Sequence, residues 1–363
     1  MATHNNLNRL LGMGQSPWYD NIDRRLINNG ELKNLFSLGI TGVSSNPSIF
    51  EKAVNGSSVY DSSIQQLAKA GKSPNEICDL ITIQDIQSAA DLLYNTYEVT
   101  RGRDGYVSLE VDPDYAHDAK RTVDDATRIH KEVGRPNLMI KVPGTNEGCK
   151  AIRVLTRDGI NINVTLLFSL RHYEASAMAY IDGIRERLMD GNSVERVCSV
   201  ASVFVSRVDT KIDNILEDLK IDHPKGKIAV ANAKMIYQRF KGLFYDGIFG
   251  DPASSGAGIQ RVLWGSTSAK NPAYSDVKYV DELIGKDTIN TLPDSTLDAF
   301  LDHGTPRLTI EQGLHKATQS LDQLQQQRVD LDKICDEIQQ EGIAAFNASF
   351  KMLVDAIADK ARL

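Results

Sequence analysis

A short apolar run at the middle of the chain reads Asn137-Leu138-Met139-Ile140-Lys141-Val142-Pro143-Gly144-Thr145. Four apolar residues flank one lysine, and the Pro-Gly pair ends the run, which predicts a short buried strand. Burial of an ammonium group is costly, so Lys141 either finds a partner or has a lowered pKa. A neutral amine at a strand end is a nucleophile towards carbonyl carbon, but a lysine paired with a carboxylate would show the same pattern.

Similar strands lie on both sides of this run and alternate with helical segments. Tyr106–Asp112 precedes it with strict alternation of apolar and polar residues, and Ile160–Ser169 follows it. Further strands are predicted at residues 17–20, 40–47, 197–207, 260–266 and 288–293. Regular alternation of eight strands with helices predicts an α/β protein whose parallel sheet closes into a (β/α)8 TIM barrel.

No linker interrupts this alternation, so we expect residues 1–363 to form a single TIM-barrel domain. Residues 1–16 are expected to be an N-terminal extension. The long intervals 47–105 and 208–259 are helical in pattern and are expected to be insertions in the barrel. Helical periodicity in residues 309–363 predicts C-terminal helices that pack on the barrel.

Composition is typical of a soluble globular protein, with 41% hydrophobic and 25% charged residues. A net charge of −7 argues against a nucleic-acid-binding surface. No apolar run has the length of a signal peptide or a membrane span, so we expect no membrane partner. The four cysteines (Cys78, Cys149, Cys198 and Cys335) are far apart and predict reduced thiols in a cytoplasmic protein.

Polar residues recur at the predicted carboxyl ends of the strands, where such barrels build their active sites. They are Asp20, Asn46, Glu110, Lys141, Asn163 with Thr165, Ser202 with Arg207, and Ser266. Together they would supply an amine, two carboxylates for proton transfer, hydroxyl-binding amides and a cation for an anionic group. This combination favours a Schiff-base enzyme that acts on a polyhydroxylated phosphate.

Each of these residues also has an ordinary structural alternative. Asp20 is suited to cap a helix, and Asn46 to begin a turn before proline. Glu110 and Arg207 are suited to ion pairs, and Thr165 to a strand. The seven histidines form no HxH or HExxH pattern, and there is no GxGxxG or GxxxxGK[ST] motif, so we expect neither a metal nor a nucleotide cofactor.

Six motifs of this chain resemble those of transaldolases, and the resemblance runs from about Trp18 to the C-terminus. The motifs are Gly42–Phe50 (GVSSNPSIF), Val107–Asp112 (VSLEVD), Met139–Gly144 (MIKVPG), Asn163–Ser169 (NVTLLFS), Ser202–Arg207 (SxFxxR) and Leu263–Pro272 (LWxSTxxKNP). With its Trp-Tyr-Asp at the first strand, the chain looks like the larger bacterial subgroup.

The resemblance implies a class I aldolase mechanism without metal or organic cofactor. Lys141 would form an imine with the C2 ketone of a ketose phosphate, and Asp20 would take the proton of the C4 hydroxyl. Glu110 with Thr165 would position a water during imine formation and hydrolysis. The implied substrates are those of the pentose phosphate pathway: sedoheptulose 7-phosphate and glyceraldehyde 3-phosphate, which exchange to erythrose 4-phosphate and fructose 6-phosphate.

The resemblance also implies a substrate-binding set. Asn46, Asn163 and Ser202 would hold the hydroxyls of the dihydroxyacetone unit, and Arg207 would bind the phosphate. Ser44, Phe204, Ser266 and Lys270 complete the set. Lys270 is a departure, because other transaldolase subgroups place an arginine after the seventh strand. Asp23 is an alternative to Asp20 near the first strand.

Two other functions compete with transaldolase. An aldolase of the same fold, acting as a lyase on fructose 6-phosphate, would release the dihydroxyacetone unit; related enzymes of that kind have a tyrosine where this chain has Glu110. A sugar-phosphate-binding barrel without catalysis would leave Asp20 and Glu110 without a role. We expect a monomer or a homodimer.

Overall fold

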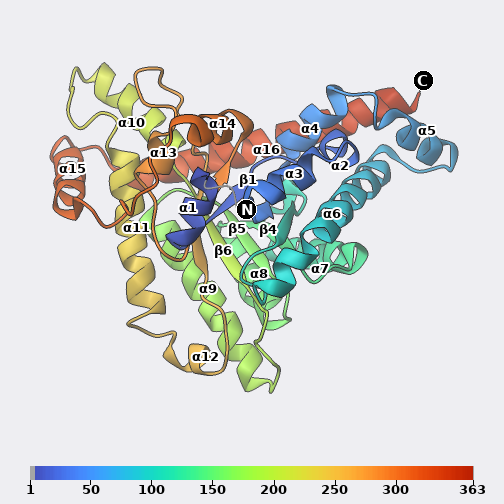
Figure 1. Cartoon of the computed structure of the whole chain (residues 1–363), viewed down its shortest axis with the longest axis horizontal. Coiled ribbons are helices and arrows are strands. Elements are labelled where there is room, and N and C mark those ends of the chain that lie inside the picture. Colours follow the sequence, from blue (N-terminus) through green and yellow to red (C-terminus); the bar gives the residue numbers. More distant parts are fainter. Residues whose placement is uncertain (1–4, 363) are drawn as a thin grey trace.

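The computed structural model describes residues 5–362, in which eight parallel strands close into one barrel (Figure 1). Each strand pairs with the next one along the chain, and the eighth pairs with the first. The strands are β1 (Gln15–Tyr19), β2 (Gly42–Val43), β3 (Tyr106–Glu110), β4 (Leu138–Pro143), β5 (Ile162–Leu167), β6 (Ser199–Phe204), β7 (Arg261–Gly265) and β8 (Thr288–Leu292). The predicted (β/α)8 barrel is confirmed.

Helices connect the strands and surround the barrel. Those that follow β3 to β8 are η1 (Pro113–Tyr115), α7 (Ala119–Val133), α8 (Asn146–Arg157), α9 (Leu170–Met189), α10 (Ser206–Asp218), α11 (Ile228–Phe244), α12 (Gly250–Ser254), α13 (Lys278–Asp281) and α14 (Asp294–His303). The earlier ones are α1 (Asn6–Gly12), α2 (Arg24–Asn28), α3 (Glu31–Leu38), α4 (Pro47–Asn55), α5 (Asp61–Lys69) and α6 (Pro74–Val99). The helices expected within the two long intervals are present.

The helix starts follow local capping chemistry. Ser73 and Glu76 form a reciprocal capping box at α6, with Pro74 in its first turn. Thr145 caps α8 directly after β4, and Ser169 caps α9 after β5. Each cap satisfies a backbone N–H that the helix leaves free, so the chain turns sharply from strand to helix at these points.

The segment expected to be an N-terminal extension contains folded structure. Helix α1 packs against β1 and α14, and its Leu7 and Leu10 are fully buried. The first strand begins at Gln15, two residues before the predicted Pro17. The polar composition of the first residues hides two leucines three positions apart, which lie on one face of a helix.

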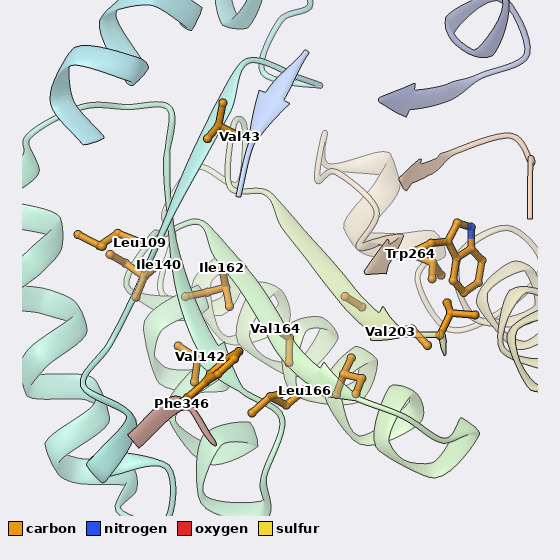
Figure 2. Packing of buried hydrophobic residues seen from close by; sticks show 14 of the residues in the cluster. Val43, Leu109, Ile140, Val142, Ile162, Val164, Leu166, Val203, Trp264 and Phe346 are labelled. Atoms are coloured by element: carbon orange, nitrogen blue, oxygen red, sulfur yellow. The ribbon is translucent and has the colours of Figure 1, made fainter. Parts of the chain in front are cut away.

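Strand parity separates the interior of the barrel from its wall. Trp18, Met139 and Leu263 belong to one apolar cluster with Tyr106, Val200 and Ile289. Their neighbours in sequence, such as Ile140 and Trp264, belong to the larger cluster between strands and helices (Figure 2). Because side chains alternate along a strand, the positions two residues after the interior cluster also face inwards. Those positions include Asp20, Lys141 and Ser202.

The chain ends in two helices, α15 (Leu314–Gln326) and α16 (Leu331–Ala361). Helix α16 crosses the molecule and packs against α4, α5, α6 and α10 (Figure 1). It also contacts β5, so it lies over the carboxyl ends of the strands. None of the helices within residues 5–362 is both long and apolar enough to cross a membrane.

Candidate active site

Lys141 lies in β4 and is only 2% exposed, with its side chain inside the barrel. Its Nζ donates a hydrogen bond to the Ser45 carbonyl at 3.0 Å and a longer one to Ser44 Oγ at 3.4 Å. Strand pairing places Glu110 on one side of it and Asn163 on the other. The three polar positions predicted on neighbouring strands are therefore adjacent.

Glu110 faces the lysine, with Oε2 3.9 Å from Lys141 Nζ. Neither of its carboxylate oxygens accepts a hydrogen bond from a described residue. Burial raises its pKa to about 7, and the charge of Lys141 opposes this shift. A carboxyl group that titrates near neutral pH can both give and take a proton, as general acid-base catalysis requires.

Thr165 lies in β5, one strand beyond Lys141, and is fully buried. Its hydroxyl has no hydrogen-bond partner among residues 5–362. Leu166, directly after it, has a φ of 58°, in the left-handed region, and the pairing of β5 with β6 shifts between Val164 and Leu167. The strand is thus bulged at Leu166, a distortion that is over-represented beside active sites.

Asp20 directly follows β1 and lines the cavity that contains Lys141. Burial raises its pKa and nearby Asp294 acts in the same direction, while Lys141 and Lys270 lower it. The alternative, Asp23, caps α2 and accepts hydrogen bonds from the backbone and guanidinium of Arg25. Of the two aspartates, therefore, Asp20 has the carboxylate that is available to a substrate.

Nine of the twelve residues predicted for the site line one cavity of about 290 Å³. They are Asp20, Ser44, Asn46, Lys141, Ser202, Phe204, Arg207, Ser266 and Lys270. A larger cavity of about 580 Å³ lies between α6, α7 and α16; Glu110 and Asn46 line it, but Lys141 does not. The smaller cavity is therefore the candidate active site, despite its size.

Asn163 lies deeper in the barrel, where hydrogen bonds hold its side chain. It donates to Ser108 Oγ at 3.0 Å and accepts from Ser202 Oγ at 2.6 Å. Asn46 has two roles, because its Oδ1 caps α4 while the residue lines the cavity. Asn46 therefore caps a helix and does not begin a turn, and this structural role is compatible with substrate binding.

Besides Lys141, three cationic side chains line the cavity, and none of the ion pairs among the described residues involves these three. They are Lys52, Arg207 and Lys270. Arg207 does not pair with Asp209; its guanidinium lies 5.6 Å from the centre of the Phe204 ring, and burial lowers its pKa. Unneutralised cations around a polar cavity are suited to bind a phosphate group.

Several residues of the cavity were not among those predicted. Ser48 and Lys52 follow the Asn-Pro motif on α4, and Phe346 comes from α16. For Lys52 a signal existed, since it lies four residues after Ser48, on the same face of α4. Phe346 had no local signal, because only the packing of α16 across the barrel brings it to the site. Within residues 5–362 no group of three or more His, Cys, Asp or Glu side chains is arranged to hold a metal ion.

A family model described as "Transaldolase/Fructose-6-phosphate aldolase" matches residues 17–357. The chain belongs to the transaldolase/fructose-6-phosphate aldolase family. The resemblance to transaldolases predicted from the six motifs is thereby confirmed.

Curated relatives of this family are similar to the chain over nearly its whole length. A transaldolase of Trichodesmium erythraeum is 41% identical, with 99% of this chain and 98% of that protein covered. A transaldolase of Saccharopolyspora erythraea is also 41% identical, with 99% of both chains covered. A transaldolase of Neisseria meningitidis serogroup C is 40% identical over 96% of this chain and 98% of its own.

Proposed function

We propose that this protein is a transaldolase that transfers a dihydroxyacetone unit between sugar phosphates through an imine on Lys141. One observation carries this proposal: Lys141 faces the buried carboxyl group of Glu110, with 3.9 Å between Nζ and Oε2, and that carboxyl group accepts no hydrogen bond from a described residue. Imine formation requires an amine and a nearby acid that can give and take a proton, and Glu110, with a pKa of about 7, is such an acid. Asp20 and the cations of the cavity extend the site towards the rest of a sugar phosphate.

Imine formation begins when Lys141 Nζ, as the neutral amine, attacks the C2 carbonyl of the ketose; a proton then moves from the nitrogen to the former carbonyl oxygen and gives a carbinolamine with a hydroxyl at C2. Glu110 in its protonated form gives a proton to the hydroxyl that leaves as water, and the C–N double bond forms. Thr165, one strand further on, has a hydroxyl available to orient that water. Hydrolysis at the end of the cycle reverses these steps, with Glu110 as base.

Cleavage then uses Asp20 from the other side of the cavity. Its carboxylate takes the proton of the C4 hydroxyl, the C3–C4 bond breaks, and the electron pair moves into the imine to give an enamine. The raised pKa of Asp20 makes it a better base for this step than an exposed aspartate. The aldose phosphate leaves, and the enamine attacks the next aldehyde while Asp20 returns the proton.

The proposed substrates are sedoheptulose 7-phosphate and glyceraldehyde 3-phosphate, which give erythrose 4-phosphate and fructose 6-phosphate. Ser44, Asn46, Asn163 and Ser202 would hold the hydroxyls of the dihydroxyacetone unit. At the mouth, Arg207 would bind the phosphate, supported by Lys270 and Ser266. Phe204 supports the Arg207 guanidinium with its ring.

A lyase that releases dihydroxyacetone from fructose 6-phosphate is the second candidate, because the family description names that activity too. The residue opposite Lys141 distinguishes the two proposals. A glutamate with a pKa of about 7 assists repeated proton transfer during imine formation and hydrolysis, whereas tyrosine stands at this position in the related aldolases. Glu110 therefore favours transfer.

A coupled assay with fructose 6-phosphate, with and without erythrose 4-phosphate, tests this choice. We expect glyceraldehyde 3-phosphate to accumulate only when erythrose 4-phosphate is present, because the enamine needs an acceptor. Equal rates without the acceptor would identify a lyase. Borohydride trapping with fructose 6-phosphate, followed by peptide mapping, should place the adduct on Lys141; an adduct on another lysine would contradict the mechanism.

A further inference from the structure

Helix α16 presents one row of residues to the carboxyl end of β5. Cys335, Gln339, Gly342 and Phe346 recur at intervals of four, three and four, so they lie on one face of the helix. Cys335 Sγ donates to the Phe168 carbonyl at 3.4 Å. Phe346, at the other end of the row, lines the cavity around Lys141. The row thus runs along the strand end towards the active site.

Gln339 is buried in the middle of this row, with 6% exposure. Its Nε2 donates to the Leu166 carbonyl at 2.9 Å and to the Gly144 carbonyl at 3.1 Å. Leu166 is the residue with left-handed backbone directly after Thr165. Gly144 directly follows β4, which carries Lys141. One amide group therefore joins the ends of the two strands that carry the proposed nucleophile and the water-positioning hydroxyl.

Gly342 allows the helix to approach this closely. A Cβ atom at that position would lie 2.9 Å from Leu166 Cδ2 and 3.5 Å from Arg207 Nη1. Leu166 and Phe346 belong to the same buried apolar cluster (Figure 2). Contacts with α16, in addition to its own strand, therefore restrain the left-handed backbone at Leu166.

We propose that Gln339 is a positioning residue that sets the Thr165 hydroxyl relative to Lys141 and Glu110 by holding the bulge at Leu166. This inference rests on the proposed transaldolase mechanism. Gln339 does not line the cavity, so it acts through the backbone and not on the substrate. A leucine keeps a left-handed conformation only when its surroundings fix it, and the two hydrogen bonds of Gln339 supply that restraint.

The substitution Gln339→Met tests this role, because methionine has a similar length and flexibility but no N–H donor. We expect kcat to fall by roughly 10- to 100-fold, since small displacements of a reacting group have effects of this order. KM for fructose 6-phosphate should stay within about threefold, because the residues that hold the substrate are unchanged. Single-turnover borohydride trapping should show imine formation slowed by the same factor as kcat.

The adjacent Gln340→Met is the matched control. Gln340 is exposed, and its side chain is hydrogen-bonded to the exposed His117 at 3.2 Å. We expect its kcat and its rate of imine formation to equal those of the wild type. If both glutamine variants behave alike, Gln339 has no special role.

A double variant distinguishes positioning from a general loss of structure. Thr165→Val alone removes the hydroxyl that Gln339 is proposed to place. If Gln339 acts through Thr165, Gln339→Met adds less than about threefold to the effect of Thr165→Val, because interacting residues are not additive. Independent effects that multiply would overturn the proposal, and so would a wild-type kcat in Gln339→Met.

Gly342→Ala provides a second route if Gln339→Met fails to fold. Its methyl group pushes α16 away from Leu166, and we expect the same slow imine formation with a smaller loss, of roughly 3- to 10-fold. Wild-type imine formation in this variant would contradict the proposal. Failure of the underlying function is distinguishable, because the wild-type protein would then form no trapped adduct at Lys141.

Discussion

The buried charged groups at the two ends of the barrel interior differ in their hydrogen bonding. At the amino-terminal end, Arg261 donates to Ser16 Oγ at 2.8 Å and to Asp104 Oδ1 at 3.0 Å. Ser16 and Trp18 donate to the same Asp104 carboxylate. At the carboxyl-terminal end, Glu110 Oε2 lies 3.9 Å from Lys141 Nζ, but neither oxygen of Glu110 nor the hydroxyl of Thr165 has a hydrogen-bond partner among the described residues.

This difference suits the groups at the amino-terminal end to stabilise the fold and those at the carboxyl-terminal end to take part in the reaction. A buried ion pair that is fully hydrogen-bonded has no capacity left for a substrate, whereas an unpartnered group is free to bind or transfer a proton. Barrels of this class place their active sites at the carboxyl ends of the strands. We therefore expect substitutions at the carboxyl-terminal end to lower turnover, and substitutions at the amino-terminal end to lower the free energy of unfolding.

Lys141→Ala is expected to have the largest effect. Without the amine no imine forms, so turnover should fall by more than about 10³-fold in the coupled assay. The free energy of unfolding should fall much less, because the Glu110 carboxyl group left behind has a pKa raised by burial and can take up a proton. Lys150→Ala, at an exposed lysine of α8, is the control and should retain full turnover. If Lys141→Ala loses activity only because it unfolds, the expected difference between the two ends of the barrel does not hold.

Arg261→Met should lower the stability of the protein and leave its turnover unchanged. It leaves Asp104 buried without its cation, which we expect to lower the free energy of unfolding by about 3–5 kcal/mol in urea denaturation. Turnover per folded molecule should be unchanged. Adding Asp104→Asn to Arg261→Met should recover part of the lost stability, because the unpaired charge is removed. A large change in kcat with intact stability would mean that the amino-terminal end takes part in the chemistry.

Arg207→Met is expected to weaken phosphate binding at the carboxyl-terminal end. Loss of a charged hydrogen-bonding group is worth roughly 1.5–3 kcal/mol, so KM for fructose 6-phosphate should rise by roughly 10- to 150-fold. Arg157→Met, at an exposed arginine of α8, should leave KM unchanged. If Arg207→Met lowers the free energy of unfolding and leaves KM unchanged, Arg207 stabilises the fold, as Arg261 does, and does not bind the phosphate.

The pH dependence of stability gives the smallest effect. The pKa of Glu110 is raised from 4.5 to about 7 in the folded protein. Between these values the unfolded chain loses the proton and the folded protein keeps it, so Glu110 lowers the free energy of unfolding as pH rises. Its stabilising contribution is complete below the unfolded pKa and is lost as pH rises through about 7.

Urea unfolding at about pH 5 and about pH 7.5 measures this loss. The decrease in the free energy of unfolding between the two pH values should be smaller in Glu110→Gln than in the wild type. Gln340→Met, at an exposed residue without a titratable group, is the control and should keep the pH dependence of the wild type. Identical pH dependence in Glu110→Gln and wild type would show that Glu110 has an ordinary pKa.

Strand parity made much of the site predictable. Glu110, Lys141, Asn163 and Thr165 occupy inward positions of neighbouring strands, and their alternation with apolar residues is visible in the sequence. The choice between Asp20 and Asp23 needed the structure, because both lie near the end of β1 and only hydrogen bonding shows that Asp23 is already used as a helix cap.

Contacts made by α16 were beyond the reach of sequence patterns. Periodicity indicated a helix in this region, but the partners of Gln339 lie far away in the sequence, and nothing local selects them. The bulge at Leu166 was also hidden, since leucine has no preference for left-handed backbone and the run Asn163–Ser169 has the composition of a regular strand.

The crossing of α16 over the barrel has a consequence for biosynthesis. Phe346 walls the cavity and Ser349 bonds Ser48 on α4, yet both belong to the helix that is translated last among the described residues. A nascent chain with all eight strands outside the ribosome therefore still lacks one wall of the candidate active site. Lys141 reaches its final surroundings only once the last helix has emerged and docked.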